Sequence, residues 1–357
     1  MAVLRGYKSG DEDQIVKLFN EVFKNDRDVS YWRWEFLEGT YGQAVMALAD
    51  EDGRIVGQCT LLPSKLQVGG KDLLGGQSID AMVHKDFRRR GYYENLAFLS
   101  YDMGRDIGIK FRYGFPSKEA LQGILEKLGG SLVCDIPLYM YVYRVDRFLS
   151  ILFKNKIISK IFSYPIEFVL WIMRIMKKNK IKSKDDYEFA EINEFDQSFD
   201  ELWERVRKNY PTMTLRQSDF LNWRIKNHPT IKYKTFGILE KGKLKGYIVL
   251  KDEDRLVKGK YPLKLGSIVD LIAEDEDSVV ALCGKANKYF KSIGVDFAVC
   301  WILDGMKYGN TLKNVGFIKT KSKIPFAVKN LTEDSSIDEH IFKEENWYLM
   351  PIESDIY

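Results

Sequence analysis

The stretch Ser78–Glu94 reads SIDAMVHKDFRRRGYYE and predicts a strand, a basic loop and the start of a helix. The apolar run that ends at Val83 favours a buried strand, and the glycine at Gly91 marks the beginning of the helix. Backbone amides at a helix N-terminus point outward and, together with the helix dipole, favour an anion. Three consecutive arginines (Arg88–Arg90) add positive charge beside a glycine that permits close backbone approach. The stretch therefore predicts a phosphate-binding loop, although it has neither the lysine of a Walker loop nor the spaced glycines of a dinucleotide fingerprint.

Alternating strands and helices surround this stretch. Upstream we expect a strand at Val3–Tyr7, a helix capped by Asp11 and running to Phe23, a helix at Asp28–Leu37, and hairpin strands at Ala44–Ala49 and Ile55–Leu62. Downstream we expect a strand at Ile109–Tyr113, a helix at Ser117–Leu128 and a strand at Leu132–Val145. Antiparallel strands followed by strand–helix–strand–helix–strand indicate an α/β fold, a mixed sheet with one βαβ crossover in the middle.

The second half of the sequence repeats the first. YWRWEFLEG around Trp34 corresponds to FLNWRIKNH around Trp223, 189 positions later. The same offset relates Gly53 to Gly242, Gly57 to Gly246 and Ser78 to Ser267. A shared offset through several landmarks indicates a duplicated domain. We therefore expect a first domain at 1–145, a helical basic linker at 146–186 and a second domain at 187–357.

The charge is concentrated in the linker. The chain has 55 Lys and Arg against 51 Asp and Glu, a net charge of +4. Residues 151–184 hold nine basic residues and one acid, so the rest of the chain has a net charge of −4. A mildly acidic body argues against a nucleic-acid-binding surface. The segment 151–184 has two interpretations, a helical linker packed between the domains or a basic amphipathic segment in peripheral contact with a membrane.

Length and composition exclude several protein classes. A chain of 357 residues exceeds one ordinary core, and 45% hydrophobic with 30% charged residues is typical of a soluble globular protein. Four scattered cysteines predict no disulfide framework, and three distant histidines predict no metal site. The first residues lack the apolar core of a signal peptide, so we expect a cytoplasmic protein.

The loop and its flanks resemble the GNAT acetyltransferase superfamily. The superfamily signature, Arg/Gln-x-x-Gly-x-Gly/Ala, fits RRRGYY through Gly91 but meets Tyr93 where a small residue is usual. The following segment, Gly114–Gly130, resembles the next strand and helix of these enzymes, with Ser117 in the place of an asparagine and Leu125 in the place of a tyrosine. The resemblance covers about Val3–Val145 and, more weakly, Tyr187–Val328, so the chain as a whole resembles a tandem GNAT protein.

The resemblance implies acetyl-CoA, or another acyl-CoA, as the co-substrate. It assigns CoA binding to the end of the strand, the basic loop and the next helix: Ala81, Met82, Val83, Arg88, Arg89, Arg90, Gly91, Tyr92, Tyr93 and Ser117. An acceptor ammonium must lose a proton before it attacks the thioester, and Asp80 on the key strand is the first candidate for the base. The carboxylate of the chain end, Tyr357, is a second candidate, because some tandem relatives use theirs. Tyr113 and Tyr139 are candidates for the acid that Leu125 does not supply.

The second copy differs at the position of the loop. There the sequence is AEDEDSVVAL, acidic and without glycine, and its carboxylates would repel a diphosphate. We therefore expect a degenerate second domain and one CoA per chain. The expected function is N-acetyl transfer from acetyl-CoA to a primary amine of a small-molecule acceptor, for example an amino sugar. The alternatives are a long-chain or carrier-protein-dependent acyltransferase at a membrane surface and a non-catalytic CoA-binding or scaffold protein.

Overall fold

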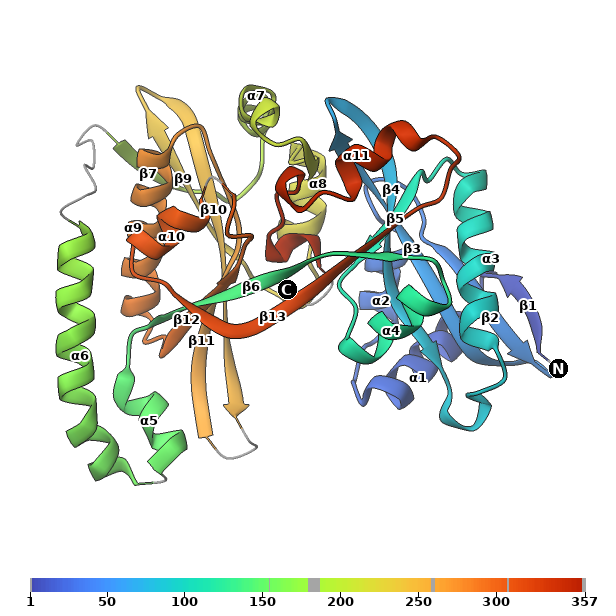
Figure 1. Cartoon of the computed structure of the whole chain (residues 1–357), viewed down its shortest axis with the longest axis horizontal. Coiled ribbons are helices and arrows are strands. Elements are labelled where there is room, and N and C mark those ends of the chain that lie inside the picture. Colours follow the sequence, from blue (N-terminus) through green and yellow to red (C-terminus); the bar gives the residue numbers. More distant parts are fainter. Residues whose placement is uncertain (1, 154, 179–186, 258–260, 307, 355–357) are drawn as a thin grey trace.

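The computed structural model describes residues 2–153, 155–178, 187–257, 261–306 and 308–354. In this part of the chain, 13 strands form one mixed sheet, in the order β1-β2-β3-β4-β5-β13-β6-β12-β11-β10-β9-β7, with β8 paired to β3 (Figure 1). The first half contains β1 (Val3–Gly6), α1 (Glu12–Phe23), α2 (Val29–Phe36), β2 (Val45–Glu51), β3 (Arg54–Val68), β4 (Lys71–Val83), α3 (Tyr92–Asp106), β5 (Phe111–Gly114), α4 (Lys118–Glu126) and β6 (Ser131–Val142). The linker contains α5 (Val145–Phe153) and α6 (Lys156–Lys178).

The second half has the same order of elements. It contains β7 (Tyr187–Glu191), α7 (Gln197–Val206), β8 (Thr212–Thr214), α8 (Ser218–Leu221), the π-helix η3 (Asn222–Lys226), β9 (Lys234–Glu240), β10 (Lys243–Val257), β11 (Tyr261–Ala273), α9 (Glu276–Ser292), β12 (Phe297–Trp301), α10 (Gly309–Asn314) and β13 (Ile318–Asn330). A tail follows, with α11 (Asp338–Ile341) and η6 (Pro351–Glu353). The predicted α/β fold with a mixed sheet is therefore confirmed.

The duplication is visible in the strand register. Leu48 pairs with Gln58 in the first hairpin, and Gly237 pairs with Tyr247 in the second, both at the offset of 189. A register shift follows Ala49 in β2, and the corresponding shift in the second hairpin lies between Leu244 and Gly246. A repeat that preserves even an irregularity of pairing arises from one duplicated unit rather than from two similar patterns.

Each half is completed by the last strand of the other half. β13 pairs with β5 of the first half, where Ala327 lies opposite Gly114. β6 pairs with β12 of the second half, where Met140 lies opposite Val299. β6 and β13 also pair with each other, so the sheet is continuous through the centre of the molecule (Figure 1). The domain boundaries at 145 and 187 stay a prediction, because the sheet itself does not divide there.

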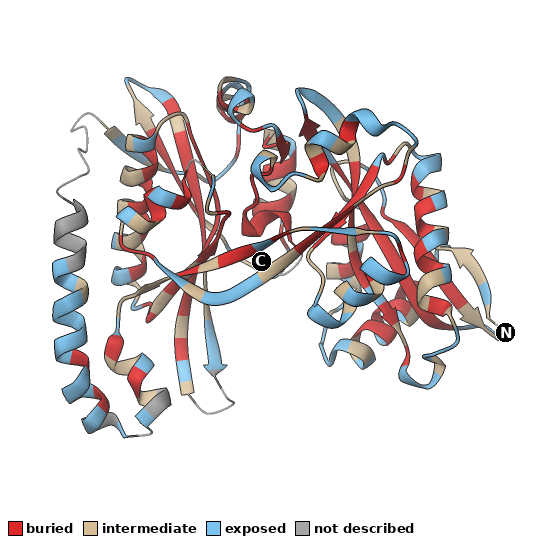
Figure 2. Cartoon of the chain, in the orientation of Figure 1, coloured by how far each residue is buried: buried red, intermediate tan, exposed pale blue. Residues whose placement is uncertain are grey.

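Helices cover both faces of the sheet in each half. In the first half, α3 and α4 bury one apolar cluster, which includes Leu96 and Ile124, and α1 and α2 bury another, which includes Ile15 and Trp32. Buried residues therefore follow the strands, and exposed residues lie on the outer faces of the helices (Figure 2). No helix within the described ranges is long and apolar enough to cross a membrane.

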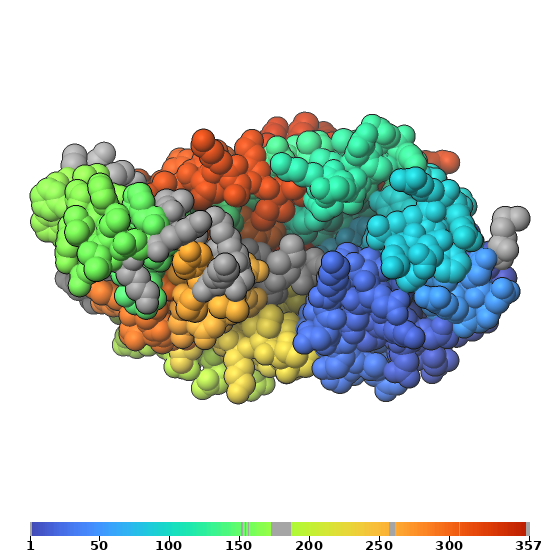
Figure 3. Space-filling model, turned by 90° about the horizontal axis from the view of Figure 1, so that it is seen from below, coloured from blue at the N-terminus to red at the C-terminus, as the bar shows by residue number. Residues whose placement is uncertain are grey.

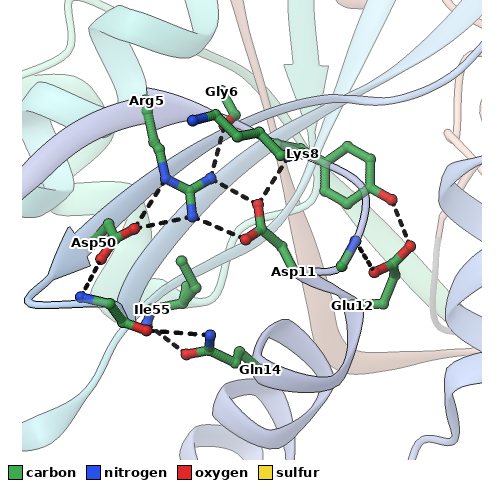
Figure 4. Close-up of polar contacts among 11 residues, drawn as sticks. Arg5, Gly6, Lys8, Asp11, Glu12, Gln14, Asp50 and Ile55 are labelled. Atoms are coloured by element: carbon green, nitrogen blue, oxygen red, sulfur yellow. Dashed lines mark hydrogen bonds and ion pairs between the residues drawn. The ribbon is translucent and has the colours of Figure 1, made fainter.

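A polar network joins β1, α1 and the first hairpin (Figure 4). Arg5 donates two hydrogen bonds to Asp11 (2.7 and 2.8 Å) and one to Asp50 (3.0 Å). Gln14 accepts from the amide of Ile55 (3.1 Å), which connects α1 to β3. The prediction that Asp11 caps α1 is wrong, since the Asp11 carboxylate turns toward Arg5 and makes no capping bond. The hydrogen bonds from Arg5 hold the pKa of Asp11 below its usual range.

Two predicted boundaries also need correction. The strand expected to reach Val145 ends at Val142, and Val145 begins α5. The strand expected at Ile55–Leu62 and the strand expected to end at Val83 are longer than predicted, since β3 and β4 continue without a break to the Gly69-Gly70 turn between them. Both errors concern strand length, which depends on pairing partners distant in sequence.

Candidate active site between two diverging strands

The two parallel strands β4 and β5 diverge in the middle of the first half. Their pairing runs from Gly75 with Phe111 to Gln77 with Tyr113 and then ends. At Gly114 the backbones are still close, since a Cβ there would lie 3.0 Å from the carbonyl oxygen of Ser78. The rest of β4 pairs only with β3, so the edge that faces β5 is open for hydrogen bonding to a ligand.

A bulge lies on this open segment of β4. Ile79 pairs with Thr60 and Met82 with Gln58, so that Asp80 and Ala81 together face one residue of β3. Asp80 has a left-handed backbone (φ +49°), and Ala81 is exposed. The bulge therefore turns the backbone of Ala81 outward at the point where the strands separate.

The carboxylate of Asp80 forms a buried ion pair with Arg27, which precedes α2. Arg27 also lies 3.6 Å from Glu35 and 3.6 Å above the ring of Phe19. Burial alone would lower the pKa of Arg27, but the two carboxylates raise it. Asp80 therefore has a permanent cationic partner.

The basic loop and the start of α3 follow the sequence prediction closely. Gly91 has φ +77° and stands directly before the first residue of α3. Arg88, Arg89 and Arg90 are all exposed. Arg88 donates through Nε to the carbonyl oxygen of Val83 (3.1 Å), and the guanidinium of Arg90 lies 4.9 Å from the ring of Phe87. Two of the three guanidinium groups are thus held beside the helix N-terminus.

The remaining predicted CoA-binding residues differ in what their side chains do. Tyr92 is buried and donates from its hydroxyl to Glu51 (2.9 Å), so only its backbone amide is available to a ligand. Tyr93 is half-buried and packs near Gly123 of α4, where a Cβ would lie 3.4 Å from its ring. Ser117 is exposed and caps α4 by accepting from the amide of Ala120 (3.2 Å). A glycine opposite Tyr93 explains how the bulky side chain is accommodated.

The other predicted side chains lie apart from one another. Met82 is buried against α1 and α2, and Val83 is half-buried on the α3 side. Leu125 is 40% exposed on α4. Tyr139 of β6 hydrogen-bonds to Asp304 at a distance from the diverging strands. Tyr357 lies outside the described residues.

A small cavity of about 20 Å³ lies where the two halves meet at the end of the paired part of β4 and β5. Polar side chains from both halves and from the tail line it, namely Glu35, Ser64, Gln77, Tyr113, Thr214, Arg224 and Glu353. Burial raises the pKa of Tyr113 to about 12, so its hydroxyl stays protonated at neutral pH. Burial also raises the pKa of Glu353, whose carboxylate accepts from Arg216 (2.9 Å).

Comparison with known families agrees with this geometry. A sequence model described as an acetyltransferase (GNAT) domain matches residues 3–131, which include the open strand, the basic loop and α4. Residues 3–131 therefore match the acetyltransferase (GNAT) domain family. Among curated proteins, no match to the chain was found.

Solved structures share the GNAT fold over nearly the whole chain. A GCN5-related N-acetyltransferase from Anabaena variabilis matches with a TM-score of 0.66 at 12% identity, covering 93% of this chain and 73% of the other. A probable N-acyltransferase of unknown function from Enterococcus faecalis gives 0.63 at 10% identity, with the same coverage. Saccharomyces cerevisiae N-myristoyltransferase with bound myristoyl-CoA gives 0.61 at 12% identity, covering 92% and 80%. At these identities the likeness is one of fold.

The corresponding place in the second half of the chain is filled. Tyr308 and Tyr348 are fully buried and donate hydrogen bonds to the carbonyl oxygens of Ala273 and Leu271, on β11. The loop between β11 and α9 is only Glu274 and Asp275.

The start of α9 is also occupied by the protein's own acids. Asp275 caps α9 by accepting from the amide of Ser278 (2.8 Å). Glu274 pairs with Arg205 and Lys245. The second half therefore has neither an open strand edge nor an open helix N-terminus.

Sequence reasoning missed the partner of Asp80. Arg216 pairs with Asp270 (2.9 Å) in the second half, and Arg216 stands 189 positions after Arg27. Asp270 stands 190 positions after Asp80, beside a bulge in the same part of its strand, since the register of β11 shifts between Ile268 and Asp270. The repeat offset was the signal that would have identified Arg27, because it relates both arginines directly.

Proposed function

We propose that the protein transfers an acetyl group, or another acyl group, from acyl-CoA to a primary amine of a small-molecule acceptor. The observation that carries this proposal is the pairing of an open β4 edge with an exposed, arginine-flanked helix N-terminus in the first half. The second half, which has the same fold, lacks both features. One CoA per chain follows from this difference.

In this proposal the CoA diphosphate binds at the start of α3. Amides of the first helical turn have no acceptor within the helix, and they receive the phosphate oxygens together with the guanidinium groups of Arg88–Arg90. Backbone groups of Ala81–Val83 align the pantetheine arm, and the hydroxyl of Ser117 lies at the start of α4 on the other side. The amine nitrogen attacks the thioester carbon, the C–S bond breaks, and the products are an amide and the CoA thiol. A backbone amide beside the bulge stabilises the negative charge that develops on the thioester oxygen.

We assign the amine end of the acceptor to the cavity. Two buried carboxylates, Glu35 and Glu353, face it and suit a cationic group, while Arg224 limits the net charge. A volume of about 20 Å³ holds roughly one water molecule, so only the amino group of an acceptor would enter. Tyr113 keeps its proton and acts as a hydrogen-bond donor in this cavity. Because Asp80 is ion-paired with Arg27, the proton passes to a water relay or to the carboxylate of the chain end.

The diphosphate site is tested by substitutions at Gly91. Both Asp and Asn tolerate a positive φ, so Gly91→Asp and Gly91→Asn differ mainly by one negative charge. We expect Gly91→Asp to weaken acetyl-CoA binding more than tenfold in calorimetric titration, and Gly91→Asn to weaken it much less. Gly294→Asp provides the remote control, because Gly294 also has a positive φ (+75°) and open space around it. Equal affinity of Gly91→Asp and Gly91→Asn for acetyl-CoA would refute the diphosphate site.

Catalysis is tested by release of the CoA thiol against a panel of primary amines. We expect the release of CoA thiol to depend on an amine. We also expect Gly91→Asp to abolish this release at low acetyl-CoA concentration. Tight binding of acetyl-CoA without release for any amine in the panel would contradict the proposed acceptor class.

A second candidate is a long-chain acyl donor, supplied as acyl-CoA or by a carrier protein. The observation that favours it is the exposed apolar surface of α6, which lies on the same chain as the acyl-transfer site. Thiol release with acyl-CoA donors of increasing chain length decides between the two. A higher kcat/KM for long-chain donors than for acetyl-CoA would favour this candidate.

A further inference from the structure

The helices α5 and α6 form a hairpin at one end of the molecule. α6 packs against α5 and touches α10 of the second half, and it lies at the outer edge of the sheet (Figure 1). Seen from below, α6 is at the opposite end of the molecule from the first half (Figure 3). The linker therefore does not pack between the two halves, which was one of its two predicted interpretations.

The burial pattern of α6 is inverted for a helix on a water-soluble surface. Its buried residues include Ser159 and Ser163, which are 1% and 2% exposed and donate to carbonyl oxygens of their own helix. Its exposed residues include Ile157 (73%) and Phe168 (60%). A helix at a soluble surface normally turns its apolar residues inward and its polar residues outward. The apolar side of α6 faces away from the protein.

This apolar surface is continuous and large. Within the described part of the chain, 12 of the 21 exposed large apolar side chains belong to this hairpin: Phe148, Phe153, Ile157, Ile158, Ile161, Phe162, Tyr164, Ile166, Phe168, Val169, Trp171 and Ile172. The remaining nine are scattered over other elements, as single exposed apolar residues normally are. Figure 2 shows α6 as an exposed helix along most of its described length. A contiguous patch of this kind marks a surface that another apolar phase covers.

The charge of residues 151–184 indicates which apolar phase covers the exposed surface of α6. Residues 151–184 have nine basic residues against the single acid Glu167, and the exposed Lys160 stands among the apolar residues. Trp171 and Tyr164 are exposed on the same helix, and these side chains prefer the interface between headgroups and acyl chains. Basic and apolar residues on one helix fit a surface that is both anionic and apolar, which is an anionic lipid bilayer.

We propose that the α5–α6 hairpin docks the protein on anionic lipid bilayers. The helix lies in the plane of the interface, because its exposed apolar residues extend from Ile157 to Ile172 and all of them reach the acyl boundary only in that orientation. Its serine side stays on the protein, and the exposed Lys160 meets the headgroups. The inference does not depend on the acyl-transfer reaction proposed above.

Vesicle flotation with the full-length protein tests the proposal. The probes are vesicles of phosphatidylcholine alone and of phosphatidylcholine mixed with phosphatidylglycerol. We expect the wild type to float with the mixed vesicles and to remain in solution with phosphatidylcholine alone. High salt weakens binding because it screens the lysines.

Two matched variants distinguish binding through the hairpin from non-specific binding by exposed apolar residues. The triple variant Ile161→Ser, Phe168→Ser, Trp171→Ser should bind mixed vesicles at least tenfold more weakly. The control variant Val3→Ser, Phe98→Ser, Leu256→Ser removes the same number of exposed apolar side chains elsewhere and should bind like the wild type. Unchanged thermal unfolding shows that both variants are folded, as expected for exposed positions.

Fluorescence reports the contact directly. Trp171 is the one exposed tryptophan of the seven, all of which are described. Brominated phosphatidylglycerol should therefore quench the wild type and leave Trp171→Phe unquenched. The proposal is overturned if the wild type does not bind mixed vesicles or if the triple variant binds them as the wild type does. It is also overturned if gel filtration shows a dimer that the triple variant abolishes.

Discussion

Asp80 illustrates how a residue at the proposed reaction site can be structural. Its ion pair with Arg27 has a counterpart in the second half, where Asp270 pairs with Arg216. In each pair the arginine has a second acid nearby, Glu35 for Arg27 and Glu353 for Arg216. The second half lacks the open strand and the arginine loop. The ion pair between Asp270 and Arg216 therefore stabilises the bulge and takes no part in CoA binding or acyl transfer. By the same argument we expect Asp80 to hold the bulge in place rather than to accept the proton of the acceptor.

The variants Asp80→Asn and Asp270→Asn test this expectation. Each leaves a buried arginine with one carboxylate fewer, and each should lower the free energy of unfolding by roughly 3 kcal/mol. Below its melting temperature, Asp80→Asn should retain thiol release within about tenfold of the wild type, with the same pH profile. Loss of a general base would instead slow release by about 10²–10⁴-fold at unchanged stability.

The basic loop and helix start of the proposed diphosphate site were predictable because their residues are contiguous. Arg88–Tyr93 carry the charge, the glycine and the helix start within six positions, and local sequence determines all three. The roles of Tyr92 and Arg27 were not predictable in this way. Tyr92 turns inward because Glu51, on a distant strand, accepts its hydroxyl, and Arg27 reaches β4 only after the sheet is assembled.

At the scale of elements, α2 and η3 join the two halves. Trp34 and Trp223 occupy equivalent positions in the repeat and stack on each other, with ring centroids 5.2 Å apart. His228 lies beside them, 4.5 Å from the ring of Trp34, and its Nδ1 accepts from the amides of Thr230 and Ile231. The repeat showed that the two tryptophans are equivalent, but the sequence did not indicate that they pack on each other.

The protonation of His228 predicts a pH dependence of stability. Burial, with the charges of Arg224 and Lys251, lowers the pKa of His228 to about 3. An unfolded histidine titrates near 6.5, so stability from the neutral ring is fully present above that pH and is lost as pH falls from about 6.5 to 3. The slope should approach about 1.4 kcal/mol per pH unit. His228→Asn keeps an acceptor for the two amides and should remove this part of the slope in urea unfolding at pH 4, 5, 6 and 7; parallel curves for both proteins would contradict the assignment.

At the scale of the whole molecule, the exchange of β6 and β13 determines how the chain holds together. β13 of the second half lies between β5 and β6 of the first half. β6 of the first half lies between β13 and β12 of the second half. The repeat was predictable from the offset of 189, but the exchange was not. β6 and β13 would complete either sheet with similar patterns of side chains, and their actual neighbours depend on contacts between distant parts of the chain.

Cleavage of the linker tests the exchange. A specific protease site inserted between Lys178 and Tyr187 should be cut without loss of the folded state. We expect the two fragments to coelute on gel filtration and to unfold in one transition, since separation would expose the edges of β5, β13, β6 and β12 at once. Elution of two separate folded fragments without denaturant would contradict the exchange.

The exchange also has a consequence for biosynthesis. When the ribosome has released the first half, β5 still lacks its neighbour, because Ala327 and the rest of β13 are made near the end of translation. An N-terminal half with a bare strand is a target for chaperones and for aggregation until then. A nascent chain that stops before Ile318 cannot close its first sheet, so the first half is finished only after β13 has been synthesised.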